Sequence, residues 1–126
     1  MPVFAGVPND LNITSFVIPE DVTSIGEKAF YSCLRLTEVV IPEGVTSIGA
    51  EAFRGCSSLR AIDIPSSVTS IGNSAFAGCS SLSSIVIPGG MTRIGACTFF
   101  GCHNLISVNI PEGVTSIGES AFYSCF

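Results

Sequence analysis

The sequence carries little charge, few of the residues that usually perform chemistry, and no long apolar run. Of its 126 residues only 12% are charged, with a net charge of −5, one histidine and no tryptophan. The five basic residues are scattered, which argues against nucleic-acid binding, because phosphate recognition needs grouped Lys and Arg. No apolar stretch approaches the roughly 18 residues of a membrane span, and the first residues show neither the basic nor the apolar segment of a signal peptide.

The motifs of cofactor, metal and catalytic sites are also missing. Glycines recur but form neither GxGxxG nor GxxxxGK(S/T), so we expect no nucleotide cofactor. The cysteines do not form the closely spaced ligand pairs that zinc usually requires. His103 is adjacent to Cys102, but a catalytic Cys–His pair needs the imidazole beside the thiol and a third group that orients it. We therefore expect no enzyme, no catalytic residue, no cofactor and no metal.

What the sequence does contain is a repeat with a constant period. The stretch at residues 41–49, followed by 52–56, recurs every 23 residues. The recurring prolines are Pro19, Pro42, Pro65, Pro88 and Pro111, the phenylalanines are Phe30, Phe53, Phe76, Phe99 and Phe122, and the cysteines are Cys33, Cys56, Cys79, Cys102 and Cys125. A fixed period between 20 and 50 residues is typical of a solenoid, in which each coil buries its apolar side on its neighbours.

Each repeat predicts a short series of elements. Val39 and Ile41 are two residues apart and share one face of a short strand, which Pro42 ends because it offers no backbone donor. Residues 45–48 are rich in β-branched side chains and predict a second extended stretch, and the following glycine permits a turn. Residues 52–53 predict one short helical or 3₁₀ turn. We expect equivalent strands to stack in parallel, with unbroken backbone ladders and like residues over like residues.

The two ends of the chain depart from the regular repeat. We interpret residues 1–12 as a degenerate half-repeat that caps the N-terminus, since residues 4–7 resemble 76–79, with an insertion of three residues around 8–10. Residues 13–126 hold about five repeats, of which the last is incomplete. The whole chain, 1–126, is thus predicted to be a single solenoid, and Val114, Ile117 and Phe122 are candidates for an open edge where further copies could stack.

The repeat resembles a known family. The pattern L-x-x-I-x-I-P-x-x-V-T-S-I-G-x-x-A-F-x-G-C-x-x-L, over residues 13–126, is similar to the BspA-like (Treponema-type) leucine-rich repeats. The resemblance implies a curved right-handed solenoid, mainly β, with a parallel sheet on its concave face. It also implies an extracellular or cell-surface protein of bacteria or some protists, and a role in adhesion.

The cysteines divide into a column and one exception. The repeat places one cysteine of each coil in line, and free cysteine behaves as a small apolar residue, so a column of buried thiols is favoured over disulfides or a metal site. Cys97 instead occupies a position at which the other coils have Lys28, Glu51, Ser74 and Ser120. It is either a reactive or intermolecular thiol or an ordinary surface cysteine.

The side chains that flank the inward-facing strand residues define a candidate binding face. They vary between coils, and they include three valines that would form an apolar stripe. The residues are Ser15, Val17, Glu38, Val40, Ala61, Asp63, Ser84, Val86, Ser107 and Asn109.

We expect a non-enzymatic binding or adhesion module that presents this face to a protein or glycan partner, although a face without a ligand also fits. The alternative is a structural protein that stacks end to end into oligomers or filaments through its terminal coils.

Overall fold

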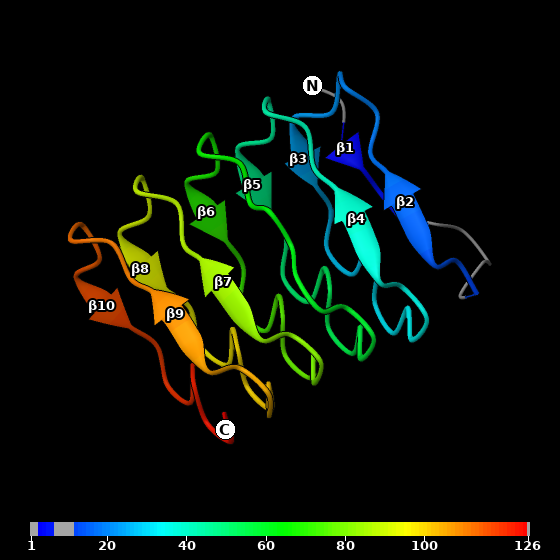
Figure 1. Ribbon diagram of the computed structural model, residues 1–126. Helices are drawn as coiled ribbons and strands as arrows, with labels where there is room; N and C mark the ends of the chain where they lie inside the picture. Colours follow the sequence, from blue (N-terminus) through cyan, green and yellow to red (C-terminus); the bar gives the residue numbers. More distant parts are fainter. Residues whose placement is uncertain (1–2, 7–11, 126) are drawn as a thin grey trace.

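The computed structural model describes residues 3–6 and 12–125. The chain winds into successive coils, and equivalent strands of neighbouring coils lie side by side (Figure 1). Paired residues of neighbouring coils are 23 positions apart, as in the pair Phe16 and Val39. The parallel solenoid predicted from the repeat is confirmed. We number the coils one to five by residues 13–35, 36–58, 59–81, 82–104 and 105–125.

Two of the three walls of the solenoid are built from short parallel strands. The first wall contains β2 (Ser15–Val17), β4 (Glu38–Val40), β7 (Ser84–Val86) and β9 (Ser107–Asn109). The second wall contains β1 (Val3–Phe4), β3 (Ser24–Ile25), β5 (Ser47–Ile48), β6 (Ser70–Ile71), β8 (Arg93–Ile94) and β10 (Ser116–Ile117).

The first wall is interrupted in coil three, so the prediction of an unbroken ladder is wrong there. Residues 61–63 form no strand, and among the described residues β4 pairs only with β2, and β7 only with β9. Alanine and aspartate are both unfavourable in strands. In a closed ladder Asp63 would lie between Val40 and Val86, and diagonally across from Glu38, where two like charges repel.

The second wall is interrupted one coil later. It contains the sheet β1-β3-β5-β6 and, separately, the pair β8 and β10. The break coincides with Met91, which replaces the valine of the other four coils and is only 2% exposed. A longer side chain in a packed interior pushes its surroundings apart, and Met91 belongs to coil four and lines a small cavity together with Ile71 of coil three.

The third wall consists of turns and has no interruption. No helix occurs in residues 3–6 or 12–125; in place of the expected helical or 3₁₀ turn, each coil has consecutive turns with hydrogen bonds between residues i and i+3, such as Ala52 N to Gly49 O at 3.2 Å. Three backbone hydrogen bonds tie every coil to the next. Those between coils one and two are Lys28 N to Ala50 O at 3.0 Å, Phe30 N to Ala52 O at 2.7 Å and Ser32 N to Arg54 O at 2.7 Å.

Two positions of each turn segment adopt a left-handed backbone. The first is never glycine, and Glu51 and Cys97 have φ angles of 59° and 57° there. The second is glycine in coils two to four and serine in coils one and five, where Ser32 has a φ of 59°. Left-handed non-glycine residues are strained by roughly 1–2 kcal/mol each, so the hydrogen bonds between coils must hold them in place.

The phenylalanine column forms the centre of the core. The rings of Phe30, Phe53, Phe76 and Phe99 are at most 1% exposed. Successive centroids in this column are 5.1, 5.3 and 5.8 Å apart, and the ring planes differ by at most 6°. These separations lie within the range of about 4.5–7 Å for favourable aromatic pairs. Like residues therefore stack over like residues, as the repeat predicts.

The N-terminal strand lies in a different register from the one its sequence suggests. The resemblance of residues 4–7 to 76–79 would place Phe4 in the phenylalanine column. Instead β1 pairs with β3 so that Phe4 aligns with Ile25. The ring still reaches the column and stacks on Phe30 at 5.3 Å, so Phe4 covers the end of the core from a strand position.

The proposed cap, 1–12, stays a prediction. Residues 1–2 and 7–11 lie outside the described residues, and the expected insertion around Pro8-Asn9-Asp10 is among them.

In three of the Ile-Gly pairs the glycine is required because the backbones of neighbouring coils approach closely. A Cβ added to Gly49 would lie 2.7 Å from Glu27 N and 2.8 Å from Gly26 C, both backbone atoms of coil one. Gly72 and Gly118 meet the backbone of the preceding coil in the same way. The expectation that this glycine serves a turn is therefore incomplete, since it also sets how closely the coils stack.

The column cysteines from Cys56 onward each donate a hydrogen bond across the core. Sγ of Cys56 donates to Phe30 O at 3.1 Å, and Sγ of Cys79 donates to Phe53 O at 3.2 Å. No disulfide links the six cysteines, all of which lie in the described residues, and five of them are buried, which agrees with the predicted thiol column. Desolvation raises the pKa of Cys56 to about 12, with a further contribution from Cys33, and it raises the pKa of Cys79 well above its usual value.

We predict that Gly49→Ala lowers the free energy of unfolding by roughly 1–3 kcal/mol, because its methyl group overlaps backbone atoms that cannot move independently. Urea denaturation followed by circular dichroism measures this. Gly89→Ala is the control, since nothing lies within 4 Å of an added Cβ there, and its effect should stay within about 0.5 kcal/mol. Equal effects would show that close approach is not the constraint.

We predict that only Cys97 reacts rapidly with a thiol reagent in the folded protein. The thiolate is the reactive form, and a thiol with a pKa of about 12, such as Cys102, is ionised to about one part in 10⁴ at pH 8. Cys97 is partly exposed. Iodoacetamide labelling followed by mass spectrometry should show one rapidly labelled cysteine in the folded chain and none in the folded Cys97→Ser variant. In urea all six cysteines of the unsubstituted chain should be labelled. A fast reaction at Cys56 or Cys79 would contradict the buried column.

Candidate binding surface

All ten residues predicted for the binding face are exposed. They project outward from the first wall, while the residues between them point into the core, as in β7, where Ile85 is buried between exposed Ser84 and Val86. We call this set the strand face. Its exposure follows from the alternation of side chains along each strand.

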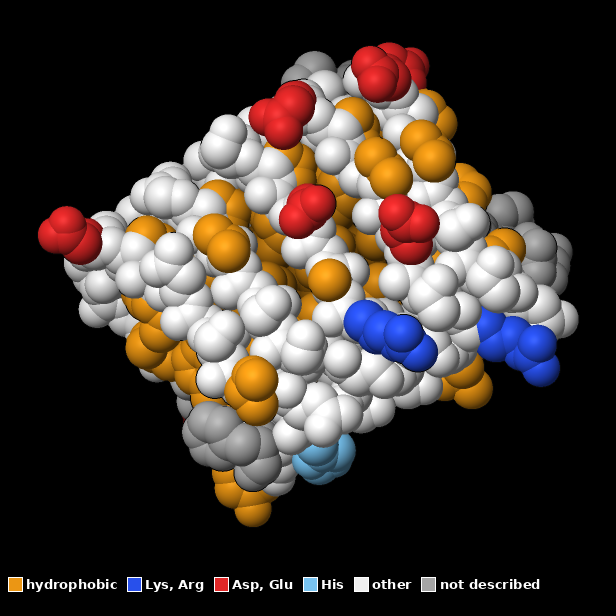
Figure 2. Space-filling view, in the orientation of Figure 1, with side chains coloured by type: hydrophobic (Ala, Val, Ile, Leu, Met, Phe, Trp, Pro, Cys, Tyr) orange, Lys and Arg blue, Asp and Glu red, His pale blue; other side chains and the backbone are white. Residues whose placement is uncertain are grey.

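The predicted apolar stripe on the strand face is divided. Val17, Val40 and Val86 are 69%, 46% and 63% exposed. The position between Val40 and Val86 belongs to Asp63 of coil three. Figure 2 accordingly shows hydrophobic side chains on this side as separate patches among polar and acidic ones. Coil three thus differs from its neighbours in both backbone and charge.

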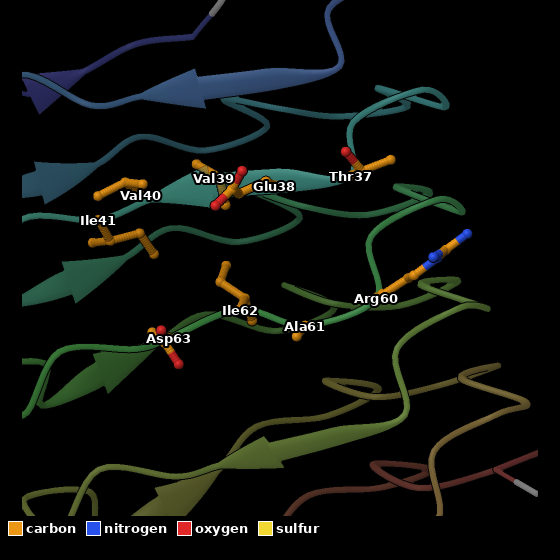
Figure 3. A pocket seen from close by; sticks show the side chains of 9 residues that line it. All are labelled: Thr37, Glu38, Val39, Val40, Ile41, Arg60, Ala61, Ile62 and Asp63. Atoms are coloured by element: carbon orange, nitrogen blue, oxygen red, sulfur yellow. The ribbon is translucent and has the colours of Figure 1, made fainter.

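The interruption of the first wall opens a groove in the strand face. It lies between β4 and residues 60–63 and has a volume of about 710 Å³. Figure 2 shows it as a hollow with hydrophobic side chains at the bottom, and Figure 3 shows the residues that line it. The lining residues are Thr37, Glu38, Val39, Val40, Ile41, Arg60, Ala61, Ile62 and Asp63.

Sequence reasoning missed this groove, although four of its lining residues belong to the predicted face. The available signal was coil three itself. Ala61 and Asp63 stand where the other coils have serine or glutamate and valine or asparagine.

The charges of the groove are separated. Glu38 and Asp63 lie on opposite banks, and Arg60 lies at one end with its guanidinium pointing away from both (Figure 3). The salt bridges of the described residues lie elsewhere, where Glu51 pairs with Lys28 at 3.9 Å and with Arg54 at 2.8 Å. The groove therefore presents two carboxylates above an apolar floor.

The predicted assembly edge lies on coil five. Ile117 is 53% exposed, whereas its counterpart Ile94 in coil four is 3% exposed. Val114 and Phe122 are partly buried and pack against the core. An apolar pocket of about 240 Å³ adjoins Phe122 and is lined by Leu105, Ile106, Ser107, Val108, Ile110 and Cys125. The structure thus brings Phe122 into a larger apolar end surface, which sequence reasoning described by three residues only.

Cys102 and His103 have different hydrogen-bond partners. Sγ of Cys102 donates to Phe76 O at 3.1 Å inside the core. The exposed His103 places Nδ1 3.0 Å from Ser124 O. The described part of the chain contains no group of three His, Cys, Asp or Glu side chains suited to a metal ion, and no helix in it is long and apolar enough to cross a membrane.

Three solved structures share this coil arrangement. A leucine rich repeat protein of T. pallidum is 30% identical with a TM-score of 0.68, covering 89% of this chain and 63% of its own. A leucine rich cell surface protein of Faecalibacterium prausnitzii is 28% identical with a TM-score of 0.62, covering 91% and 46%. A leucine-rich repeat protein from Eubacterium ventriosum, 23% identical with a TM-score of 0.70 and covering 98% and 46%, supports the fold alone. The chain thus spans about half to two thirds of the length of these proteins.

Sequence comparison gives the family directly. Comparison with curated proteins finds no match. A family model described as the BspA type leucine rich repeat region matches six copies over residues 7–126. The model covers most of the chain and agrees with the coil length, the parallel strands and the similar solved structures, and the chain therefore belongs to the BspA-type leucine-rich repeat family.

Proposed function

We propose that this protein is a non-enzymatic binding or adhesion module that presents its strand face to a protein or glycan partner. The observation that carries the proposal is the contrast between the uniform core and the variable, exposed strand face. Uniform core positions keep the coils stacked, while the outward positions differ from coil to coil and can be matched to a ligand.

The family supports this proposal. BspA-type leucine-rich repeats form a fold often used in binding or adhesion. Leucine-rich repeat proteins generally bind proteins and are generally non-enzymatic. The similar protein of F. prausnitzii carries the description of a cell surface protein, and we propose an extracellular or cell-surface location for this chain too.

A second candidate function is assembly of the chain with its own copies. The favouring observation is the apolar end of coil five, where Ile106, Ile110 and Ile117 are 77%, 42% and 53% exposed. Covering these exposed apolar side chains with a coil of another copy would remove them from water, which is favourable. A head-to-tail contact that does not close on itself produces oligomers or filaments.

We predict that Val17→Glu combined with Val86→Glu weakens partner binding by at least about tenfold, because an interface must then desolvate two carboxylates. Binding is measured on a glycan array and on immobilised extracellular-matrix proteins. Leu34→Glu is the matched control, since Leu34 is 58% exposed and lies outside the strand face. Equal losses in both variants, or a loss only in the control, would show that the strand face is not the binding surface.

We predict that Ile117→Lys prevents concentration-dependent growth in mass, because a buried lysine must be desolvated in the stacked coils. Light scattering across a concentration series, with and without reductant, measures this. If the unsubstituted chain has the mass of a monomer at all concentrations, assembly is ruled out. A dimer that is lost with reductant would identify a Cys97 disulfide instead.

A further inference from the structure

We propose that the groove between β4 and residues 60–63 binds an extended peptide segment of a partner protein that carries lysine or arginine, and that the segment adds a strand to β4. The inference rests on the proposed function of the strand face. It deepens that function by naming one site on the face and one chemical class of partner.

The backbone of β4 offers an open edge at this groove. β4 pairs with β2 on one side, and no strand of the described residues pairs with it on the other. Backbone N–H and C=O groups of a strand point alternately to its two sides, so some of those in β4 point toward the missing neighbour. An open edge of this kind takes up an extended chain through backbone hydrogen bonds.

The groove has room and an apolar floor. Its volume of about 710 Å³ lies within the range of roughly 300–1,000 Å³ seen for ligand sites. Val39, Ile41 and Ile62 line it and are only 5–8% exposed. The side chains of an added strand alternate between two faces, so apolar ones would point toward this floor while the others point to solvent.

The charges at the rim favour a cationic side chain on the outer side of that segment. Glu38 and Asp63 are exposed on opposite banks, and neither takes part in the salt bridges of the described residues. Arg60 points away from both (Figure 3). An ammonium or guanidinium group lying between the banks would offset the repulsion of the two carboxylates, which closing the ladder would increase.

The test uses the full chain and fluorescein-labelled peptides, with fluorescence anisotropy as the readout. The peptide TVKVKVT should bind saturably, and more weakly as salt is raised. TVEVEVT should bind at least about tenfold more weakly because two charge pairs are reversed. TVKPKVT should also bind at least about tenfold more weakly, because proline lacks the N–H that a ladder needs. Absence of saturable binding, or equal binding of either control peptide, would overturn strand addition.

Two variants place the site. Ala61→Ser with Asp63→Val gives coil three the strand sequence of coil four, Ser84-Ile85-Val86, and should close the groove, abolish binding and leave the circular dichroism spectrum folded. The double variant Glu38→Lys with Asp63→Lys should bind TVKVKVT at least about tenfold more weakly than the unsubstituted chain does. The matched control, Glu43→Lys with Glu112→Lys, changes two exposed acids outside the groove and should retain binding. Unchanged binding in the closed variant would overturn the proposal.

The result can be separated from that of the proposed function. Val17 and Val86 do not line the groove, so their double variant reports on the wider strand face. If that variant loses its partner while the peptide fails to bind, the strand face functions without the groove. If the peptide binds and the wider face has no partner, the groove is the binding site and the broader function is wrong.

Discussion

The stack depends on the hydrogen bonds between turn segments of neighbouring coils. Three backbone bonds of 2.7–3.1 Å join each coil to the next on this wall, in every pair of coils from one to five. They hold left-handed residues such as Glu51 that would be strained by themselves, and they lie next to the stacked phenylalanines. Because this wall is complete, either strand wall can open at one place without separating the coils. The interruptions at residues 61–63 and between β6 and β8 show that both do so.

The cysteine column belongs to the same arrangement. A buried thiol is usually treated as a small apolar group, but in this protein each thiol from Cys56 onward in the column donates to the carbonyl of the phenylalanine 26 residues earlier. The column therefore links the core to the turn wall of the preceding coil. Burial keeps these thiols protonated, because it raises the pKa of Cys56 and Cys102 to about 12. A chain with six cysteines can thus use five of them for packing, with no redox chemistry required.

On a surface made of nearly identical coils, the coil that differs from the others forms a feature that occurs nowhere else in the repeat. Most coils place valine or asparagine at the second outward position of the first wall, and coil three places Asp63 there. That change removes a strand, opens β4 on one side and sets two carboxylates across an apolar floor. The rest of the strand face keeps regular spacing and mostly small side chains. Under the proposed function, a partner that contacts the whole face would meet the groove near its middle, and the groove would set the partner's position, because the repetitive coils on either side offer equivalent contacts.

The sequence by itself determined the coil length, the family, the parallel stacking, the inward and outward residues and the thiol column. All of these follow from a period that never changes and from side chains that must alternate between core and solvent. Only the tertiary structure decided where the ladders open and which register β1 adopts. It alone also showed that residue 49 must be glycine because the backbones of two coils approach closely there. These features depend on small differences between competing contacts of neighbouring coils, such as Asp63 beside two valines or Met91 in place of valine. The repeat pattern shows where a residue is substituted. Whether the strands of two coils still pair at that position depends on the contacts of the new side chain with residues one coil away, which the sequence pattern does not show.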